Sequence, residues 1–426
     1  MAMFMKSFRK TTLGGWLKRS LATAIIAGAV ALSAPAQAND TIKIGFSMAL
    51  TGGLAGAGKG ALIAMQVWAE DVNAKGGLLG KQVELVYYDD QTNPATVPAI
   101  YTKLLDIDEV DFVVSGYGTN LIAPAMPIVM QRGLVFPSLF GLAVNAKFNY
   151  PNYFQIMPAG PEPMTDWSRG FFEVAMAQDP PPKTIALVGA DAEFAKNAVN
   201  GARTNAENLG LEIVYDESYP PKTADYTPIV NAIQARNPDI VYVGSYPPDS
   251  VGMVKAATEV GLKTKMFGGG MVGLQFASIM TNLGPKLNGI VNYDFWVPEP
   301  TLKFEGVEAF LAKYQTAAEG QGVDPLGYYL QPYAYAYLQV LEQAITATDS
   351  GDHAVLGEYI RNNSFDTVVG NVSFAPNGEW AKTRTLMVQY QGIADNELET
   401  FTKAGTRVVL YPAEWKSGDV NYPYAE

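Results

Sequence analysis

The chain has 426 residues, of which 48% are hydrophobic, so it is long enough for about two domains with large cores. Acidic residues outnumber basic ones by 42 to 30, and this negative charge argues against nucleic acid as a partner. There is no cysteine and a single histidine, His353. These counts exclude disulfides and thiolate nucleophiles, and they remove most histidine-based catalysis and metal binding. We therefore expect no cofactor and no metal site.

Residues 1–38 have the pattern of a cleavable signal peptide. Five basic residues precede an apolar run at 21–32, and the small residues Ala36 and Ala38 frame a cleavage pattern that places the cut near Ala38. The apolar run is shorter than the roughly 20 residues that a membrane-spanning helix needs. We predict an exported protein whose mature part begins at residue 39.

The first part of the mature chain alternates between strands and helices. Strands are predicted at residues 41–47, 83–88, 112–114 and 134–136. A glycine-rich loop is predicted at 52–60, and helices are predicted around 62–72, at 96–106 and at 121–131. This order indicates a parallel sheet that is covered by helices on both faces.

The same alternation restarts after the prolines at residues 161, 163 and 180–182. Strands are predicted at 184–188, 213–219, 240–244 and 265–267, with helices at 193–209, 226–236 and 250–260. The remainder is mostly helical, at 306–319, 333–346 and 354–361, and ends in strands at 386–390 and 408–410. We predict an α/β fold of two doubly wound lobes with parallel central sheets.

Two glycine-rich segments follow predicted strands. Residues 53–60 nearly match a nucleotide-binding P-loop, but Gly60 stands where the motif needs a hydroxyl for Mg²⁺. These glycines either form a tight turn or start a helix whose N–H groups receive a ligand anion. In the second segment, at 115–120, Thr119 and Asn120 either hold a ligand carboxylate or cap a helix. Phe194 and Tyr246 follow strands of the second unit, where they are placed to line a cleft.

The sequence offers no evident catalytic set. It contains no G-x-S-x-G or H-E-x-x-H motif and no nucleophile with a recognisable base. Asp89 and Asp90 follow a strand without a partner in view, which favours a solvated loop. We therefore expect a protein that is not an enzyme, with an exported enzyme as the weaker alternative.

Several short runs of residues along the mature chain match the pattern of one known family. The chain resembles the leucine/isoleucine/valine-binding family of periplasmic receptors for ABC importers. The likeness covers nearly the whole mature chain, and its carriers are residues 44–52, 73–80 with the later pair 89–90, 225–230, 237–239 and 261–263. The run Asn-Ala-Lys-Gly-Gly-Leu-Leu-Gly at 73–80 is the most specific of these.

The resemblance implies a type I periplasmic binding protein with two lobes, three crossovers and a ligand in the cleft. The crossovers fall near 157–163, 289–296 and 367–378. Lobe 1 is expected at 39–160 plus 290–372, and lobe 2 at 161–289 plus 373–426. Family membership further implies a periplasmic monomer that closes around a small molecule and docks on an ABC permease. A receptor that feeds a signalling partner instead is the alternative.

Carrying the family's site over to this chain gives ten expected ligand-binding residues. They are Tyr117, Thr119, Asn120, Phe140, Leu142, Val144, Phe194, Tyr246, Gly270 and Met271. The acid that pairs with a ligand's ammonium group is expected near residues 268–271, where none stands. We therefore expect a small carboxylate with an apolar or aromatic body, such as an aromatic acid or keto acid, rather than a standard amino acid. A shift in alignment that brings Asp249 or Glu259 to this position is the alternative.

Overall fold

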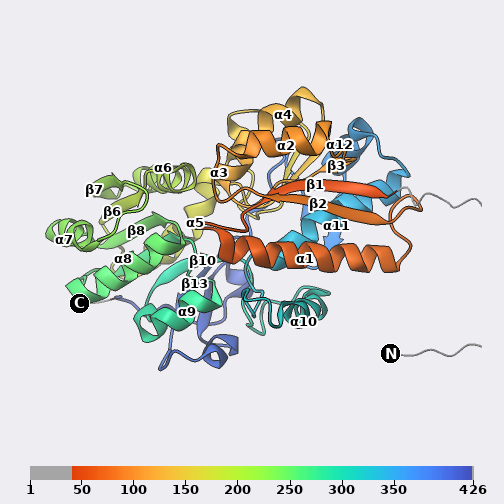
Figure 1. Cartoon of the computed structure of the whole chain (residues 1–426). Coiled ribbons are helices and arrows are strands. Elements are labelled where there is room, and N and C mark those ends of the chain that lie inside the picture. Colours follow the sequence, from red (N-terminus) through yellow and green to blue (C-terminus); the bar gives the residue numbers. More distant parts are fainter. Residues whose placement is uncertain (1–40, 425–426) are drawn as a thin grey trace, which may run out of the picture. The chain divides into compact units, whose positions relative to one another are not determined.

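The computed structural model describes residues 41–424 (Figure 1). The predicted signal peptide at 1–38 lies outside the described residues. In the described part of the chain, no helix is both long and apolar enough to cross a membrane.

The first sheet consists of three parallel strands in the order β2–β1–β3. They are β1 (Ile42–Met48), β2 (Val83–Asp89) and β3 (Phe112–Val113), which confirms the predicted strands. Helix α1 (Ala55–Ala74) lies on one side of these strands and α2 (Val97–Asp106) on the other (Figure 1). Two short strands, β4 (Phe136–Ser138) and β5 (Tyr153–Gln155), pair in parallel. Residues 119–131 form α3 (Thr119–Ile122), a 3₁₀ turn and α4 (Met126–Gln131) in place of the single helix expected there.

The glycine-rich segment 52–60 is a loop only as far as Leu54, so the loop prediction is wrong for its second half. Helix α1 begins at Ala55, and Gly58 lies buried within it. A side chain at Gly58 would collide with the backbone of Ala49, so glycine lets the helix pack closely against the chain after β1. The N–H of Gly58 donates to the oxygen of Leu54 at 3.0 Å, which favours the packing role over an anion site.

The second sheet has seven strands in the order β14–β13–β10–β9–β8–β6–β7. They are β6 (Thr184–Ala190), β7 (Glu212–Tyr219), β8 (Ile240–Ser245), β9 (Met266–Met271), β10 (Val291–Asp294), β13 (Leu386–Tyr390) and β14 (Arg407–Tyr411). The strands from β7 to β10 pair in parallel, whereas β13 and β14 pair antiparallel. Because β10 pairs with β9 and β13, residues 291–294 lie with the second sheet, although the expected boundary at 290 assigned them to the first lobe.

Helices cover both faces of the second sheet. Figure 1 shows α6 (Glu193–Asn208) on one side and α7 (Thr227–Ala235) with α8 (Pro247–Val260) on the other. Helix α5 (Pro163–Met176) packs on α6 and was not predicted from the sequence. Pro163 does not interrupt the secondary structure, because it is the first residue of α5, where the missing N–H of proline costs nothing.

The other predicted helices are confirmed as α10 (Val307–Ala318), α11 (Gln331–Thr348) and α12 (His353–Asn362). Helix α11 packs on α1, and Tyr333 and Tyr337 are buried in it. A short helix, α9 (Ala277–Leu283), and a hairpin of β11 (Ser364–Thr367) and β12 (Gly370–Ser373) were not predicted. His353 begins α12, and its Nδ1 atom accepts a hydrogen bond from the backbone of Val135 at 3.2 Å.

A buried ion pair joins β10 to β14 across the intervening strand. Nη1 of Arg407 lies 2.9 Å from Oδ2 of Asp294, and both side chains are almost fully buried. Burial raises the pKa of Asp294 to about 6 even though Arg407 favours its charged form. Each partner therefore depends on the other, because an isolated buried charge is costly.

Replacing Arg407 by Met leaves Asp294 buried without its partner, so we expect a loss of about 3–5 kcal/mol in the free energy of unfolding. Urea denaturation measures this loss, and the double variant Arg407→Met, Asp294→Asn should recover much of it. Arg203→Met, which breaks the more exposed pair with Asp216, serves as the control with an expected loss of about 1 kcal/mol or less. Equal losses in the two single variants would contradict the assigned role of the buried pair.

A second buried carboxyl lies in the segment that precedes β13. Glu379 is 1% exposed, and neither of its oxygens has a hydrogen-bond partner among the described residues. Burial raises the pKa of Glu379 well above its ordinary value. The segment is fixed in place, because the oxygen of Gly378 accepts a hydrogen bond from the backbone of Gln155 at 2.8 Å.

The raised pKa of Glu379 predicts a pH-dependent stability. The folded protein holds this proton more tightly than the unfolded chain does, so stability contributed by Glu379 is lost as pH rises above about 4.5 towards the folded pKa. We expect Glu379→Gln to be more stable than wild type by about 1–3 kcal/mol at pH 8, with a gap that closes near pH 4. Urea denaturation across this pH range measures the gap, and the exposed neighbour Glu162→Gln is the control. A gap that does not vary with pH would contradict the assignment.

Candidate ligand-binding site

Six of the ten residues expected at the site line one small cavity, here called the inner cavity. They are Tyr117, Thr119, Asn120, Phe140, Phe194 and Tyr246. These residues follow β3, β4, β6 and β8, at the carboxyl ends of strands, which is where open α/β sheets bind ligands. The inner cavity measures about 30 Å³, enough for one to three water molecules. Contact between these residues and a ligand stays a prediction.

The loop after β3 is shaped by glycine. Gly118 has a φ of 102°, which a side chain would strain, and it ends the loop immediately before α3. The buried Thr119 accepts a hydrogen bond at Oγ1 from the backbone of Leu142 at 3.0 Å, so its hydroxyl proton remains available to a ligand.

Asn120 connects this loop to the loops of the second sheet. Its Oδ1 atom accepts hydrogen bonds from the hydroxyl of Tyr246 at 2.8 Å and from the backbone of Phe194 at 3.3 Å. The same N–H of Phe194 lies 3.2 Å from the hydroxyl of Tyr246. Burial raises the pKa of Tyr246, which keeps its hydroxyl protonated as a donor. No described residue accepts a hydrogen bond from the amide nitrogen of Asn120, which leaves two donors for a ligand.

Aromatic rings form most of the wall. The ring centroid of Phe140 lies 5.5 Å from that of Tyr329, and Trp167 lies 5.7 Å from Phe194. Phe140 also has a φ of 57°, which is a strained backbone conformation for a bulky residue. Strained residues of this kind cluster at functional sites. The hydroxyls of Tyr329 and Tyr293 are 2.9 Å apart, and burial raises the pKa of both, so this end of the wall is polar but uncharged.

Six further residues line the inner cavity and were not predicted. They are Leu54, Gly118, Met157, Trp167, Val272 and Tyr329. Gly118 stands inside the loop identified from the sequence, and Val272 is one residue beyond the expected Met271. Trp167 lies on α5, the helix that the proline pattern concealed, so the sequence carried no signal for it.

Four expected residues do not line the inner cavity. Leu142 lies behind it, where its oxygen accepts a hydrogen bond from Nδ2 of Asn197 at 2.9 Å, and Val144 is buried. Gly270 and Met271 are fully buried within β9, and the backbone of Met271 donates to Oδ1 of Asn292 at 2.9 Å. These residues therefore shape the surroundings of the cavity.

None of the twelve residues that line the inner cavity carries a charge. Of the two acids considered as alternatives, Glu259 is exposed near the carboxyl end of α8, away from the strand ends. Asp249 lies at the beginning of α8 and accepts a hydrogen bond from the hydroxyl of Tyr226 at 2.7 Å. Neither acid lines the inner cavity, so the structure supplies no carboxylate there for a ligand's ammonium group.

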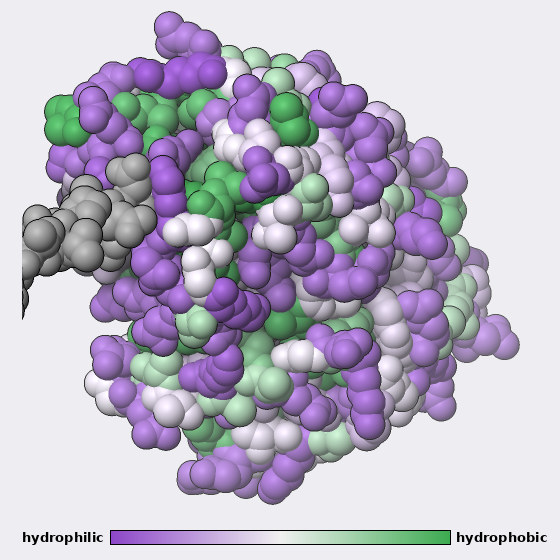
Figure 2. Space-filling view, turned by 90° about the vertical axis from the view of Figure 1, so that its right-hand side faces the viewer, coloured by the Kyte–Doolittle hydropathy of each residue, from purple (hydrophilic) through white to green (hydrophobic). Residues whose placement is uncertain are grey.

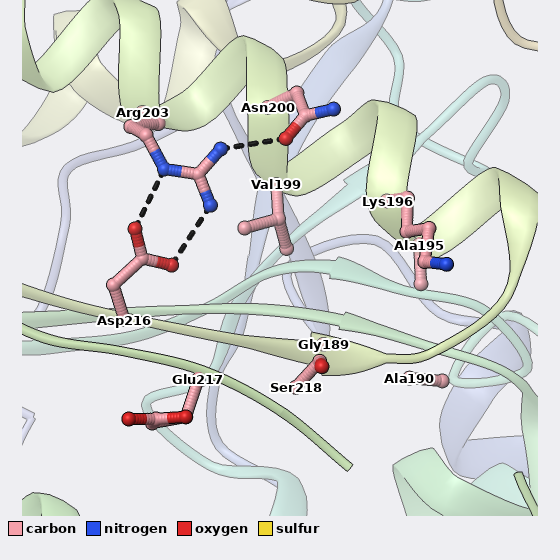
Figure 3. A pocket seen from close by; sticks show the side chains of 10 residues that line it. All are labelled: Gly189, Ala190, Ala195, Lys196, Val199, Asn200, Arg203, Asp216, Glu217 and Ser218. Atoms are coloured by element: carbon pink, nitrogen blue, oxygen red, sulfur yellow. Dashed lines mark hydrogen bonds and ion pairs between the residues drawn. The ribbon is translucent and has the colours of Figure 1, made fainter. Parts of the chain in front are cut away.

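A larger cavity of about 420 Å³ lies on the second sheet alone (Figure 3). Its residues come only from β6, β7 and α6, so the first sheet contributes nothing to it. The guanidinium group of Arg203 points at Asp216 and is bound to it through Nε and Nη2 at 2.6 and 2.8 Å. Because Arg203 is already paired with Asp216, this larger cavity is a weaker candidate for a ligand site than the inner cavity.

Comparison with known proteins gives the family. The sequence pattern of the periplasmic binding protein family matches residues 41–396. The chain belongs to the periplasmic binding protein family. The relatives of this chain are substrate-binding proteins and not enzymes. No group of three or more His, Cys, Asp or Glu side chains that could hold a metal occurs in residues 41–424.

Three similar proteins illustrate the range within the fold. The leucine-, isoleucine-, valine-, threonine- and alanine-binding protein of Pseudomonas aeruginosa is 27% identical over 370 residues, which cover 85% of this chain and 92% of the relative. A branched-chain amino acid transporter substrate-binding protein of Streptococcus pneumoniae, in complex with isoleucine, has a TM-score of 0.71 at 20% identity, covering 87% of this chain and 100% of that one. A solute-binding protein of an ABC transporter from R. palustris, in complex with 4-hydroxybenzoate, has a TM-score of 0.73 at 19% identity, covering 90% and 98%.

The hydrogen bonds of Tyr246 predict that Tyr246→Phe loosens the connection between the two sheets. Loss of the hydroxyl removes the bond to Asn120, worth about 0.5–1.5 kcal/mol, so we expect the ratio of open to closed molecules to rise about 2- to 10-fold. Because the sequence has no cysteine, spin labels attached at Thr102→Cys and Glu207→Cys measure the distance distribution directly. Tyr359→Phe, whose hydroxyl has no hydrogen bond among the described residues, is the control. An unchanged distribution in Tyr246→Phe would contradict the prediction.

Proposed function

We propose that this protein is the periplasmic receptor of an ABC importer and that its ligand is a small carboxylate with an apolar or aromatic body. The observation that carries the proposal is the inner cavity, which receives strand ends of both sheets and has no charged side chain. A charge-free aromatic wall favours an apolar body, and polar groups at one side fix its orientation.

The polar groups available at the inner cavity are donors. Thr119 retains its hydroxyl proton, and Asn120 retains its amide hydrogens, because their oxygens already accept bonds from the protein. Donors of this kind satisfy a carboxylate, which is an acceptor only. Phe194 and Phe140 line the same cavity, and their rings would contact the apolar body of such a ligand where it adjoins the carboxylate.

A standard amino acid fits this cavity less well. Its ammonium group would lose its hydration without gaining a carboxylate partner, which is costly in a buried site. Among proteins of the same fold, one is in complex with isoleucine and another with 4-hydroxybenzoate. The absence of charge among the lining residues favours the second kind of ligand for this chain.

We propose that capture occurs by hinge closure of two lobes. Lobe 1 comprises 39–160 and about 295–372, and lobe 2 comprises 161–294 and 373–426, because β10 pairs within the second sheet. A ligand that contacts both lobes binds the closed form better than the open form and shifts the equilibrium towards closure. The closed form then docks on the permease.

Export through cleavage near Ala38 and action as a monomer are part of the same proposal. The face seen in Figure 2 is mainly hydrophilic, and its hydrophobic side chains form small separate patches. Monomeric soluble proteins typically lack large exposed apolar patches, so this face supports the expected monomer.

Isothermal titration calorimetry and thermal unfolding with two groups of compounds test the ligand class. We expect benzoate, 4-hydroxybenzoate or phenylpyruvate to bind and to raise the melting temperature, and we expect leucine, isoleucine and valine to have little effect. Stabilisation by the branched-chain amino acids without any by the aromatic acids would overturn the proposed ligand class.

The variant Asn120→Asp gives a sharper test. It keeps the oxygen that accepts from Tyr246 and Phe194 but replaces the donor with a negative charge, which repels a carboxylate. We expect affinity for aromatic carboxylates to fall at least about 100-fold while the protein stays folded. Asn200→Asp makes the same charge change on the exposed side of α6 and should leave affinity unchanged. Equal affinity in Asn120→Asp and wild type would remove Asn120 from the site.

A further inference from the structure

A second cavity adjoins the inner cavity and is here called the outer cavity. It measures about 360 Å³, which lies within the range of ordinary ligand sites, whereas the inner cavity measures about 30 Å³. The loops that follow β1 and β2 form one side, and those that follow β6, β7 and β8 form the other. Leu54, Asn120 and Tyr246 line both cavities, so the two are neighbours across the hydrogen bond between Asn120 and Tyr246.

The wall that the first sheet contributes is held in an unusual conformation. Gln91 and Thr92 are successive non-glycine residues with φ values of 59° and 55°. Oδ1 of Asp89 accepts hydrogen bonds from the backbone of Gln91 at 2.8 Å and of Thr51 at 3.1 Å. The hydroxyl of Thr92 donates to the oxygen of Thr51 at 2.7 Å and accepts from the backbone of Leu54 at 3.2 Å. Strained residues that are fixed in this way cluster at ligand sites, because a rigid wall lowers the entropy cost of binding.

The chemistry of the outer cavity differs from that of the inner one. Three prolines line it, Pro94, Pro221 and Pro248, and they give it a rigid apolar surface. Its two charged residues are Asp249, which already accepts from the hydroxyl of Tyr226, and the exposed Lys222, which also has a strained φ of 68°. The cavity therefore suits an apolar group whose far end is neutral.

We propose that the binding site has two compartments and that its ligand is an elongated aromatic carboxylate. This inference rests on the proposed function. The inner cavity has the size of a head group and offers the donors of Thr119 and Asn120 to a carboxylate. The chain or ring beyond the carboxylate passes the shared residues Leu54 and Tyr246 and lies in the outer cavity between the proline-rich wall and the loop of Gln91. A short acid such as benzoate reaches only the end of the outer cavity that adjoins the inner one and leaves the rest to water.

A series of acids with one head group and increasing length tests the proposal on the unmodified protein. Benzoate, phenylacetate, 3-phenylpropanoate and 4-phenylbutanoate are titrated by calorimetry. Each buried methylene group contributes about 0.8 kcal/mol, so we expect affinity to rise about 4-fold for each added group and at least about 10-fold over the series. If benzoate binds and length brings no gain, the two-compartment site is overturned while the proposed function stands. If no member of the series binds, both fail.

A variant that fills the outer cavity supplies the second test. Ala192 lines the outer cavity but not the inner one, and its extended backbone accepts any side chain. We expect Ala192→Trp to lower the affinity of 4-phenylbutanoate about 10-fold or more and that of benzoate less than 2-fold. Thr204→Trp, at an exposed position of α6, should change neither affinity. Equal losses for the long and the short acid in Ala192→Trp would overturn the assignment of the outer cavity.

Discussion

The amide oxygen of Asn120 is the point on which the site depends. It accepts from the hydroxyl of Tyr246 and the backbone of Phe194, so two loops of the second sheet meet a single acceptor on a loop of the first. With its oxygen occupied in this way, the side chain presents only its N–H groups to the cavity. One residue therefore both connects the two sheets and gives the polar side of the cavity its donor character.

The lack of charge around the inner cavity follows from burial. Tyrosine, asparagine and threonine supply hydrogen bonds without the desolvation penalty of a buried ion. The charged groups that the chain does bury are not among the residues that line this cavity. Asp294 is paired with Arg407 within the second sheet, and Glu379, which has no partner among the described residues, has a strongly raised pKa in the segment before β13.

In the proposed two-compartment site, loops at the ends of parallel strands form both cavities. The inner cavity is lined by aromatic side chains that pack on one another, and the outer cavity by prolines and by backbone in strained conformations. Both arrangements limit motion before a ligand arrives. Such preorganisation leaves more of the contact energy available for affinity.

The sequence by itself determined most strands and most helices, because their apolar periodicity follows from which face each element buries. It also located the loop at 115–120 and the positions Phe194 and Tyr246, because residues directly after parallel strands gather at one edge of a sheet. The absence of an acid near 268–271 was likewise visible in the sequence alone.

Only the tertiary structure decided which distant residues complete the cavity. Tyr329 is distant from Phe140 in the sequence but packs against its ring. Trp167 lies on α5, a helix that begins with a proline and that the sequence pattern does not predict. Val272, the first residue after β9, lines the inner cavity, whereas Met271 is the last residue of β9 and is fully buried. Local sequence patterns determine which helix or strand forms. Strand order and long-range packing determine which side chains face each other. Strand order and packing depend on contacts between distant residues, which no local window of sequence contains.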